Sequence, residues 1–313
     1  MRNSYCDEGR STNWKNYGEK HVFSDLSATE DVLSENEKSQ LIEDGFCIKS
    51  ISPKEWMERG IDLDLISKVI NELVEKEGWR GGYDHDVTLM KEGQHPEEGA
   101  QRLNNLLYKH ECFRKVFTIP EILAASKLLI KDEINLSQMI LRMPLPGTGE
   151  MPWHVDWIPR KKSSDPVMSV LNFLLLDDYT KENGTTRVIP GSHKFLKQPS
   201  DEGYYFQDHP DQKYVEAPRG SLILCDVNVW HAGTKNQNGK NRRHLNIHYR
   251  NRKIWQQINF KKTIPNKLKY NLTPAESYLL KVRDEDPSRN DWLFYHRNNF
   301  FVKKLMNFYW NLK

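Results

Sequence analysis

The sequence predicts an α+β domain with a β sandwich or barrel as its core. Helical periodicity is concentrated in the first 130 residues, and short apolar runs separated by glycine and proline turns follow from residue 134. Helices gathered ahead of a series of short strands are typical of α+β proteins. With 313 residues the chain can bury a sizeable core, and we expect it to form one catalytic unit.

Four segments before residue 131 have the pattern of helices. Ser34 and Glu37 have the spacing of a capping box, so a short helix is expected to begin there and to end at the glycine that follows. The segment 63–77 should place one apolar face inward, made of Leu65, Ile66, Val69, Ile70 and Leu73. The segments 100–110 and 120–130 are also expected to be helical.

Six segments have the character of strands. They are 46–51, 134–143, 168–176, 185–189, 221–225 and 242–249. The segment 168–176 is almost continuously apolar, which indicates a strand that is buried on both faces.

The two ends of the chain differ from the middle. Residues 1–30 are polar and without a clear period, so we expect a loosely held arm. Residues 31–254 should form the catalytic domain, and residues 255–313 an aromatic-rich helical extension packed on it. The aromatic and basic stretch 292–310 predicts a helix docked on the barrel or on a second subunit in a homodimer. A helix lying on a membrane surface is the alternative.

Charge and cysteine content narrow the classes of function. Lys and Arg number 46 against 43 Asp and Glu, a net charge of +3, so no nucleic-acid partner is expected. The four cysteines lie far apart, which argues against a disulfide framework and against a cysteine zinc site. The first residues lack the apolar core of a signal peptide, and no window approaches the roughly 18 apolar residues of a membrane span. We therefore expect a cytoplasmic protein without a transmembrane segment.

The strongest functional signal is a His-x-Asp pair. Side chains two apart on an extended chain point to the same side, so His154 and Asp156 can converge on one ion. The best third ligand is His231, which follows the apolar run 221–225. Two histidines and one carboxylate with open positions are the ligand set of non-haem Fe(II) oxygenases.

Other polar clusters receive plainer interpretations. His193 follows Pro-Gly-Ser and is expected to be a turn residue, and Asp84-His-Asp86 is expected to be a polar loop. His244 and His248 have the spacing of a helical zinc pair, but in a strand they lie about 13 Å apart. They either contact the substrate in the cavity or act as hydrogen-bonded interior residues.

Six motifs stand in the order seen in the phytanoyl-CoA dioxygenase family, which the chain resembles from about residue 33 to 249. They are Asp-Gly-Phe at 44–46, His-Val-Asp at 154–156, Asn-Gly-Thr-Thr-Arg-Val-Ile-Pro-Gly-Ser-His at 183–193, Gly-Ser-Leu-Ile-Leu-Cys-Asp at 220–226, His-Ala-Gly at 231–233 and Arg-Arg-His-Leu at 242–245. The resemblance implies a double-stranded β-helix, a jelly-roll barrel with helices packed outside. It also implies Fe(II), 2-oxoglutarate and dioxygen, with hydroxylation of a small molecule and release of succinate and CO2.

The resemblance also implies roles for further residues. Arg242, eleven positions after the distal histidine, should bind the far carboxylate of 2-oxoglutarate. Strand alternation agrees if the polar residues face a cavity and the set containing Arg243 faces the helices. Gln138 is a candidate contact to the co-substrate, and Phe173 aligns with a barrel-wall tryptophan of some relatives. Gly233 departs from the pattern of the family, whose members often carry Ser or Thr there to help hold the distal carboxylate of 2-oxoglutarate.

The prime substrate remains open at this level. Trp157 and Lys161 are candidate substrate contacts beside His244 and His248, and the basic run 160–164 favours an anionic substrate. A zinc hydrolase with the same ligands and a non-catalytic binding barrel are the alternatives. Asp156 fills the position that a halogenating relative leaves vacant, so hydroxylation or a related oxidation is expected instead of halogenation.

Overall fold

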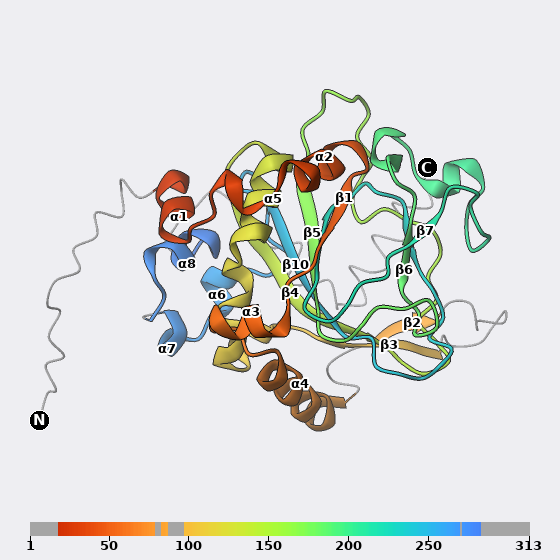
Figure 1. Cartoon of the computed structure of the whole chain (residues 1–313). Helices are drawn as coiled ribbons and strands as arrows, with labels where there is room; N and C mark the ends of the chain where they lie inside the picture. Colours follow the sequence, from red (N-terminus) through yellow and green to blue (C-terminus); the bar gives the residue numbers. More distant parts are fainter. Residues whose placement is uncertain (1–17, 79–82, 87–96, 270, 283–313) are drawn as a thin grey trace, which may run out of the picture.

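A seven-stranded antiparallel sheet forms the centre of the molecule (Figure 1). This computed structural model describes residues 18–78, 83–86, 97–269 and 271–282. Across the sheet, the strands are β1 (Phe46–Lys49), β8 (Leu222–Asp226), β5 (Ser169–Leu175), β10 (His244–Asn251), β4 (Ile134–Pro144), β3 (Glu97–Leu103) and β2 (Tyr83–Asp86). Each pairs antiparallel with its neighbours.

A second, three-stranded antiparallel sheet faces the first. Its strands, in order, are β7 (Lys213–Tyr214), β6 (Thr186–Val188) and β9 (His231–Gly233). Val188 on β6 is buried in one cluster with Leu175 of β5 and Ile223 of β8. The two sheets therefore enclose an interior between them.

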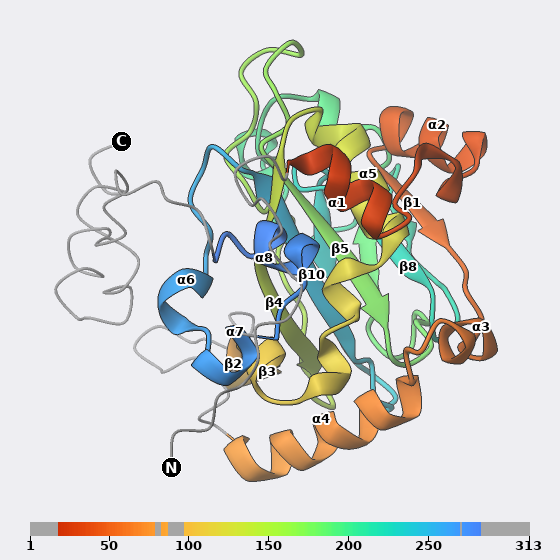
Figure 2. The ribbon, with the colours of Figure 1, turned by 90° about the vertical axis from the view of Figure 1, so that its left-hand side faces the viewer.

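Helices cover the opposite face of the large sheet (Figures 1 and 2). They are α1 (Glu19–Asp25), α2 (Glu35–Glu43), α3 (Pro53–Glu58), α4 (Leu63–Glu77), α5 (Pro120–Ile130), α6 (Phe260–Thr263), α7 (Asn266–Lys269) and α8 (Pro274–Leu279). Short 3-10 turns occur at Glu30–Val32, Leu106–Tyr108, Glu111–Phe113, Val116–Thr118, Ser192–Lys194 and Pro199–Glu202. No helix among these described elements is long and apolar enough to cross a membrane.

Local sequence signals explain where several helices begin. The Ser34 hydroxyl accepts from the backbone of Glu37, whose carboxylate accepts from the Ser34 backbone, which confirms the predicted capping box of α2. Helix α4 has the predicted bounds, with Ile66, Val69 and Ile70 buried. Leu65 was expected on the same face, but it is 39% exposed, because the buried face begins at Leu63 and continues through Ile66.

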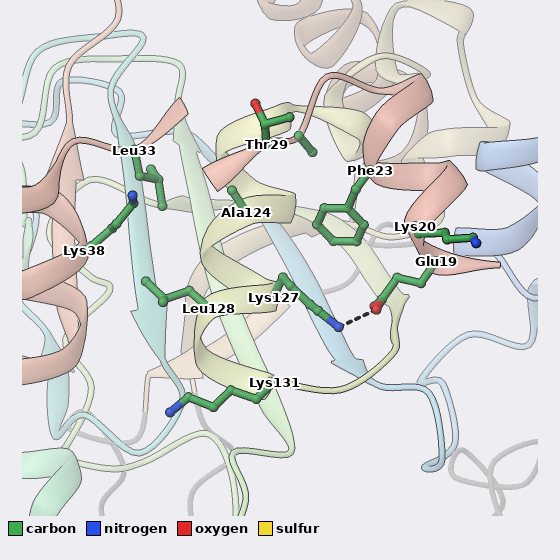
Figure 3. Close-up of a pocket in the computed structure, with 11 residues that line it drawn as sticks. Glu19, Lys20, Phe23, Thr29, Leu33, Lys38, Ala124, Lys127, Leu128 and Lys131 are labelled. Carbon is green, nitrogen blue, oxygen red and sulfur yellow. Dashed lines mark hydrogen bonds and ion pairs between the residues drawn. The ribbon is translucent and has the colours of Figure 1, made fainter. Parts of the chain in front are cut away.

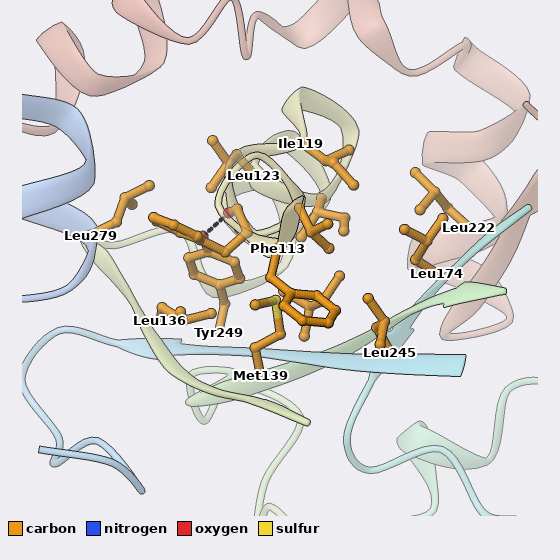
Figure 4. Packing of buried hydrophobic residues seen from close by; sticks show 14 of the residues in the cluster. Phe113, Ile119, Leu123, Leu136, Met139, Leu174, Leu222, Leu245, Tyr249 and Leu279 are labelled. Carbon is orange, nitrogen blue, oxygen red and sulfur yellow. Dashed lines mark hydrogen bonds between the residues drawn. The ribbon is translucent and has the colours of Figure 1, made fainter. Parts of the chain in front are cut away.

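The outer face of the sheet is apolar because α5 packs on it (Figure 4). Leu245, Ile247 and Tyr249 of β10 point into this core together with Leu123 of α5. The hydroxyl of Tyr249 donates to the carbonyl of Phe117 above it. The alternate residues of β10 must therefore face the interior between the sheets.

The strand register shows which side chains share that interior. His244, Asn246 and His248 of β10 lie opposite Leu175, Phe173 and Leu171 of β5. On the other side they lie opposite Arg142, Ile140 and Gln138 of β4. A polar row of β10 thus runs along the interior, with apolar side chains of β5 on one side and Arg142, Ile140 and Gln138 of β4 on the other, as the alternation of β10 predicts.

Three expectations about local structure are wrong. The predicted helix 100–110 is instead strand β3 followed by a 3-10 turn, because residues 100–103 pair with the edge of β4 and this pairing outweighs helix propensity. Asp84–Asp86 lies in β2, which pairs with β3, and is not a loop. Within the expected arm 1–30, residues 19–25 form α1, whose Val22 is fully buried.

The remaining expectations concern the chain ends and the thiols. Helices α6 to α8 occupy the first part of the expected extension, and the aromatic stretch 292–310 lies outside the described residues. Cys47, Cys112 and Cys225 are free thiols, as their spacing predicts.

Candidate active site

The backbone brings the predicted His-x-Asp pair against the distal histidine. The segment that holds His154 runs antiparallel to β9, with the His154 and His231 amides donating to each other's carbonyls at 3.0 and 3.1 Å. The amide of Asp156 donates to the carbonyl of Val227 at 2.9 Å. As a result, one ligand atom from each of the three side chains lies within 4.8 Å of the other two.

The side chains are oriented as metal ligands require. Nδ1 of His154 is 2.8 Å from the carbonyl of Pro152, and Nδ1 of His231 is 2.9 Å from that of Val229. Because a carbonyl only accepts, each Nδ1 carries a proton, which leaves Nε2 as the nitrogen that a metal would bind. The two Nε2 atoms lie 3.9 and 3.4 Å from oxygens of Asp156. The donor set therefore fits a divalent metal.

The pKa shifts of the three groups show how strongly the two imidazoles and the carboxylate interact. Burial, together with the neighbouring His231, lowers the pKa of His154 to about 4, so its imidazole is neutral. Burial alone would raise the pKa of Asp156, but the adjacent His231 and His154 bring it well below its usual range. Burial would lower the pKa of His231, yet Asp156 raises it overall. The site thus holds an ionised carboxylate between a neutral His154 and a His231 that retains a proton more readily, and a cation would compete with that proton for Nε2.

Arg242 is a buried cation without a hydrogen-bond partner. Its side chain is 0% exposed, and none of its three guanidinium nitrogens has such a partner among the described residues. The guanidinium carbon lies 4.9 Å from the ring centre of Tyr179. Burial lowers the pKa of Arg242. A buried charge of this kind is costly unless an anion pairs with it, and a carboxylate matches its planar fork.

Arg243 has a different environment. Its Nε and Nη2 donate to the two oxygens of Asp177, both at 2.8 Å, and its Nη1 donates to Asn71 of α4 at 2.8 Å. This guanidinium is already satisfied on the outside of the sheet. The two adjacent arginines therefore face opposite sides of the large sheet. Of these two, only Arg242 points into the interior between the sheets.

Aromatic and polar side chains surround Arg242. The Tyr179 hydroxyl is 2.5 Å from Nδ1 of His244, and Phe173 packs edge-on against the His244 ring with centroids 5.0 Å apart. Burial lowers the pKa of His244 well below its ordinary value, with Arg242 and Arg142 adding to the shift. His244 is therefore a neutral partner of Tyr179 within the arginine pocket.

Sequence reasoning missed Tyr179 and Arg142. Tyr179 comes after the end of β5 in a stretch without periodicity, so no pattern indicated that it turns inward. Arg142 is 9% exposed and lies opposite His244, and its Nη2 is 2.7 Å from the sulfur of Met151. The alternation of β4 from Gln138 to Arg142 could have identified it.

The other end of the polar row holds the remaining candidates. Gln138 is half-buried and lies opposite His248, whose Nε2 is 2.6 Å from the Ser169 hydroxyl. Burial, with the nearby Arg250, lowers the pKa of His248 to about 3. Trp157 stacks on the Arg250 guanidinium at 4.5 Å. These contacts place Trp157 and His248 on the side of the row away from Arg242.

The basic run after the metal segment is divided between two roles. Arg160 is turned inward, where it donates to the buried Asp226 at 2.7 Å and to the carbonyl of His193 at 2.9 Å. Lys161 and Lys162 are exposed, and their amides donate to the Asp165 carboxylate. Arg160 is therefore held against the protein, while Lys161 and Lys162 leave two exposed positive charges at the tip of the loop.

Two further expectations can be compared with the structure. His193 lies in the 3-10 turn Ser192–Lys194, as expected, with Nε2 3.2 Å from the carbonyl of Ile42. At Gly233, a Cβ atom would come within 2.8 Å of the Gly149 carbonyl oxygen. A side chain at this position would therefore require the backbone at Gly149 to move.

A small cavity of about 20 Å³ adjoins two of the three candidate ligands, Asp156 and His231, between the sheets. Asp156 and His231 line it on one side, and Phe173, Ile223 and Cys225 line it on another. Apolar side chains therefore border the donor set, while the side chains of His154 and Asp156 stay 26% and 30% exposed.

Comparison with known proteins agrees with this geometry. The phytanoyl-CoA dioxygenase (PhyH) family matches residues 84–244. An uncharacterized protein of Mycobacterium tuberculosis is 31% identical over 115 residues, which are 37% of this chain and 40% of that protein. The dioxygenase af480 of Aspergillus fumigatus is 26% identical over 184 residues, 54% of this chain and 55% of its own length. The chain therefore spans about half the length of these relatives, or less.

Solved structures share the fold. HygX from Streptomyces hygroscopicus, with nickel and 2-oxoglutarate bound, superimposes with a TM-score of 0.52 at 12% identity, covering 72% of this chain and 89% of that one. The non-heme alpha-ketoglutarate-dependent carbocyclase SnoK of nogalamycin biosynthesis gives 0.52 at 19% identity, covering 71% and 86%. The family match covers more than half of the chain, which therefore belongs to the phytanoyl-CoA dioxygenase (PhyH) family, as its motifs predict.

Proposed function

We propose that this chain is an Fe(II)- and 2-oxoglutarate-dependent dioxygenase that hydroxylates a small molecule and releases succinate and CO2. The observation that carries the proposal is a pairing of two features in one interior. His154, Asp156 and His231 converge as one donor set, and Arg242 lies buried without a hydrogen-bond partner in a pocket that His244 and Phe173 connect to them. A metal would satisfy the first feature, and a dicarboxylate that reaches the metal would satisfy the second.

The architecture supports the proposal. We interpret the two facing antiparallel sheets as the halves of a double-stranded β-helix, with α5 and its neighbours packed outside. The bridge between His154 and His231 lies within the smaller sheet's side of this barrel. We assign residues 31–254 to the catalytic domain, with the segment from 255 as an extension that contacts it.

Each residue of the site would have a distinct role. His154, Asp156 and His231 would hold Fe(II), which when bound supplies the activation of dioxygen. Arg242 would bind the far carboxylate of 2-oxoglutarate through two parallel hydrogen bonds. Tyr179 and the neutral His244 would add a hydroxyl and an imidazole beside that carboxylate, and Phe173 would form the apolar wall.

The protonation states of the protein groups also favour this role. Each ligand histidine directs Nδ1 at a backbone carbonyl, so Nε2 is the nitrogen that a metal would take, and Asp156 is ionised, so the site offers one negative charge to a divalent cation. His244 stays neutral beside Arg242, so the pocket keeps a single strong positive charge directed at the anion. A zinc hydrolase with the same ligands would leave the buried Arg242 without a function.

Formation of succinate tests the proposal. The Fe(II)-loaded protein should convert 2-oxoglutarate to succinate in the presence of oxygen, and His231→Ala should abolish this conversion. His193→Gln, which changes a buried histidine outside the donor set, should retain it. Zinc-supported hydrolysis without succinate would favour the hydrolase, and metal binding without any turnover would favour a binding barrel.

A further inference from the structure

A hollow lies on the outside of the molecule where α5 passes between α1 and α2 (Figures 1 and 3). Its volume is about 710 Å³. One face of α5 and the residue directly after this helix line the hollow with three-and-four spacing. These lining residues are Ala124, Lys127, Leu128 and Lys131. None of the residues that line it belongs to the metal site.

The floor of this hollow is apolar and uncovered. Ala28, Leu33 and Ala124 form the bottom, while Phe23 and Leu128 are half-buried on its sides. Figure 3 shows Phe23 of α1 on one side of α5 and Leu33 on the other. The small side chain of Ala124 leaves the space between them open. An apolar helix face of this kind is normally covered by a neighbouring element or a ligand.

The rim of the hollow is positively charged. Lys20, Lys38, Lys127 and Lys131 line it, against the single acid Glu19. Glu19 is already engaged, because it pairs with Lys127 and accepts from the amide of Ile134 at 3.2 Å. Lys20 and Lys131 are exposed, and neither forms an ion pair within the described part of the chain. The charge therefore favours an anionic ligand.

We propose that this hollow binds a single-chain anionic amphiphile, of the chemistry of a medium-chain carboxylate. Its alkyl chain would lie on the apolar floor, and its head group would meet the exposed ammonium group of Lys131. The stem of Lys38, whose ammonium pairs with Glu35 at 2.7 Å, would extend the apolar wall. The volume is within the range of roughly 300–1,000 Å³ typical of small-molecule pockets. Residues 292–313 are a poor match for this positively charged rim, since they carry basic but no acidic side chains.

Calorimetric titration of the full chain tests the proposal. The probes are decanoate, decanol and decyltrimethylammonium, which share an alkyl chain and differ in head-group charge, each below its micelle-forming concentration. Decanoate should bind most tightly, and Lys131→Glu should weaken its binding by about fivefold. The matched control Lys54→Glu, on exposed α3, should leave it unchanged.

A second variant tests the floor. Ala124→Trp should fill the hollow and abolish decanoate binding, with circular dichroism to verify folding; if it does not fold, Leu128→Gln replaces it, with about tenfold weaker binding expected. Equal binding of all three probes, or unchanged binding in these variants, overturns the proposal. So does binding only to phosphatidylglycerol vesicles or only above the micelle-forming concentration. If no probe binds and Ala124→Trp dissociates a dimer, the hollow is a contact between copies.

Discussion

At the scale of single residues, the two adjacent arginines make opposite predictions. Arg242→Ala should raise the 2-oxoglutarate requirement by about a hundredfold, because it removes a buried bidentate partner of a carboxylate. Arg243→Ala should leave that requirement unchanged but lower the free energy of unfolding by about 3 kcal/mol, since it strands the Asp177 carboxylate. Steady-state kinetics and denaturant unfolding separate the two. The reverse pattern would mean that Arg243 points into the interior and Arg242 points to the outside of the sheet.

Asp156 leads to a second prediction about a single residue. Its carboxylate would be the third ligand of the metal, and it would fill the position that a halide needs. We expect only oxygenated product from the unmodified protein in chloride buffer, once a substrate is found. Mass spectrometry of the product would decide, and a chlorinated product would contradict the assignment of Asp156 as a ligand.

Much of this site could be predicted from single residues. The His-x-Asp spacing and the alternation around Arg242 are local patterns, and the structure brings the predicted ligands together. Tyr179 and Arg142 could not be found in the same way. Tyr179 reaches the pocket only because its backbone pairs with Ala217 far along the chain. Such long-range pairings leave no signal in a short window of sequence.

At the scale of elements, β10 should make stability depend on pH. Burial lowers the pKa of His244 and brings that of His248 to about 3, whereas both titrate near 6.5 when unfolded. The unfolded chain therefore takes up protons that the folded chain excludes as the pH falls below 6.5. Each histidine should remove about 1.4 kcal/mol of unfolding free energy per pH unit in this range.

Denaturant unfolding of the metal-free protein between about pH 5 and pH 7 can measure this slope. His248→Gln should have a shallower dependence by about 1.4 kcal/mol per pH unit. Parallel pH profiles of the two proteins would show that His248 is not held neutral in the fold.

The loop after the metal segment carries a prediction about substrate charge. Arg160 is committed to Asp226, so only Lys161 and Lys162 remain exposed at the tip. If the substrate is anionic, as we predict, Lys161→Ala combined with Lys162→Ala should weaken its apparent affinity by about fivefold. The turnover number should stay the same. Unchanged affinity for an identified substrate would remove the loop from recognition.

Elements were predictable where their signals are local. Helix α4 has the bounds that its periodicity predicts, and α2 begins at its capping box. The failure at 100–110 has a physical reason, because strand β3 exists only through its pairing with β4 and β2. Helix α1 was missed because its short polar sequence is held mainly by contacts such as that of Glu19 with Lys127.

At the scale of the whole molecule, the two sheets separate two kinds of environment. The helix-covered outer face of the large sheet is a dry apolar core, and the inner face carries the polar row that meets the metal ligands. The fold class followed from the order of helices and strands. The closure of the sheets could not be inferred from periodicity, since it depends on pairings between strands that are distant in sequence, such as β5 with β8 and β10.

The most direct test is a titration of the Fe(II)-loaded protein with 2-oxoglutarate in the absence of oxygen. It follows the visible charge-transfer absorption that appears when a 2-keto acid chelates Fe(II), and it needs no knowledge of the prime substrate. We predict a saturable band in the unmodified protein, no band in His231→Ala, and a band in Arg242→Ala that needs about a hundredfold more 2-oxoglutarate. An unchanged titration in both variants would contradict the proposed metal and co-substrate site.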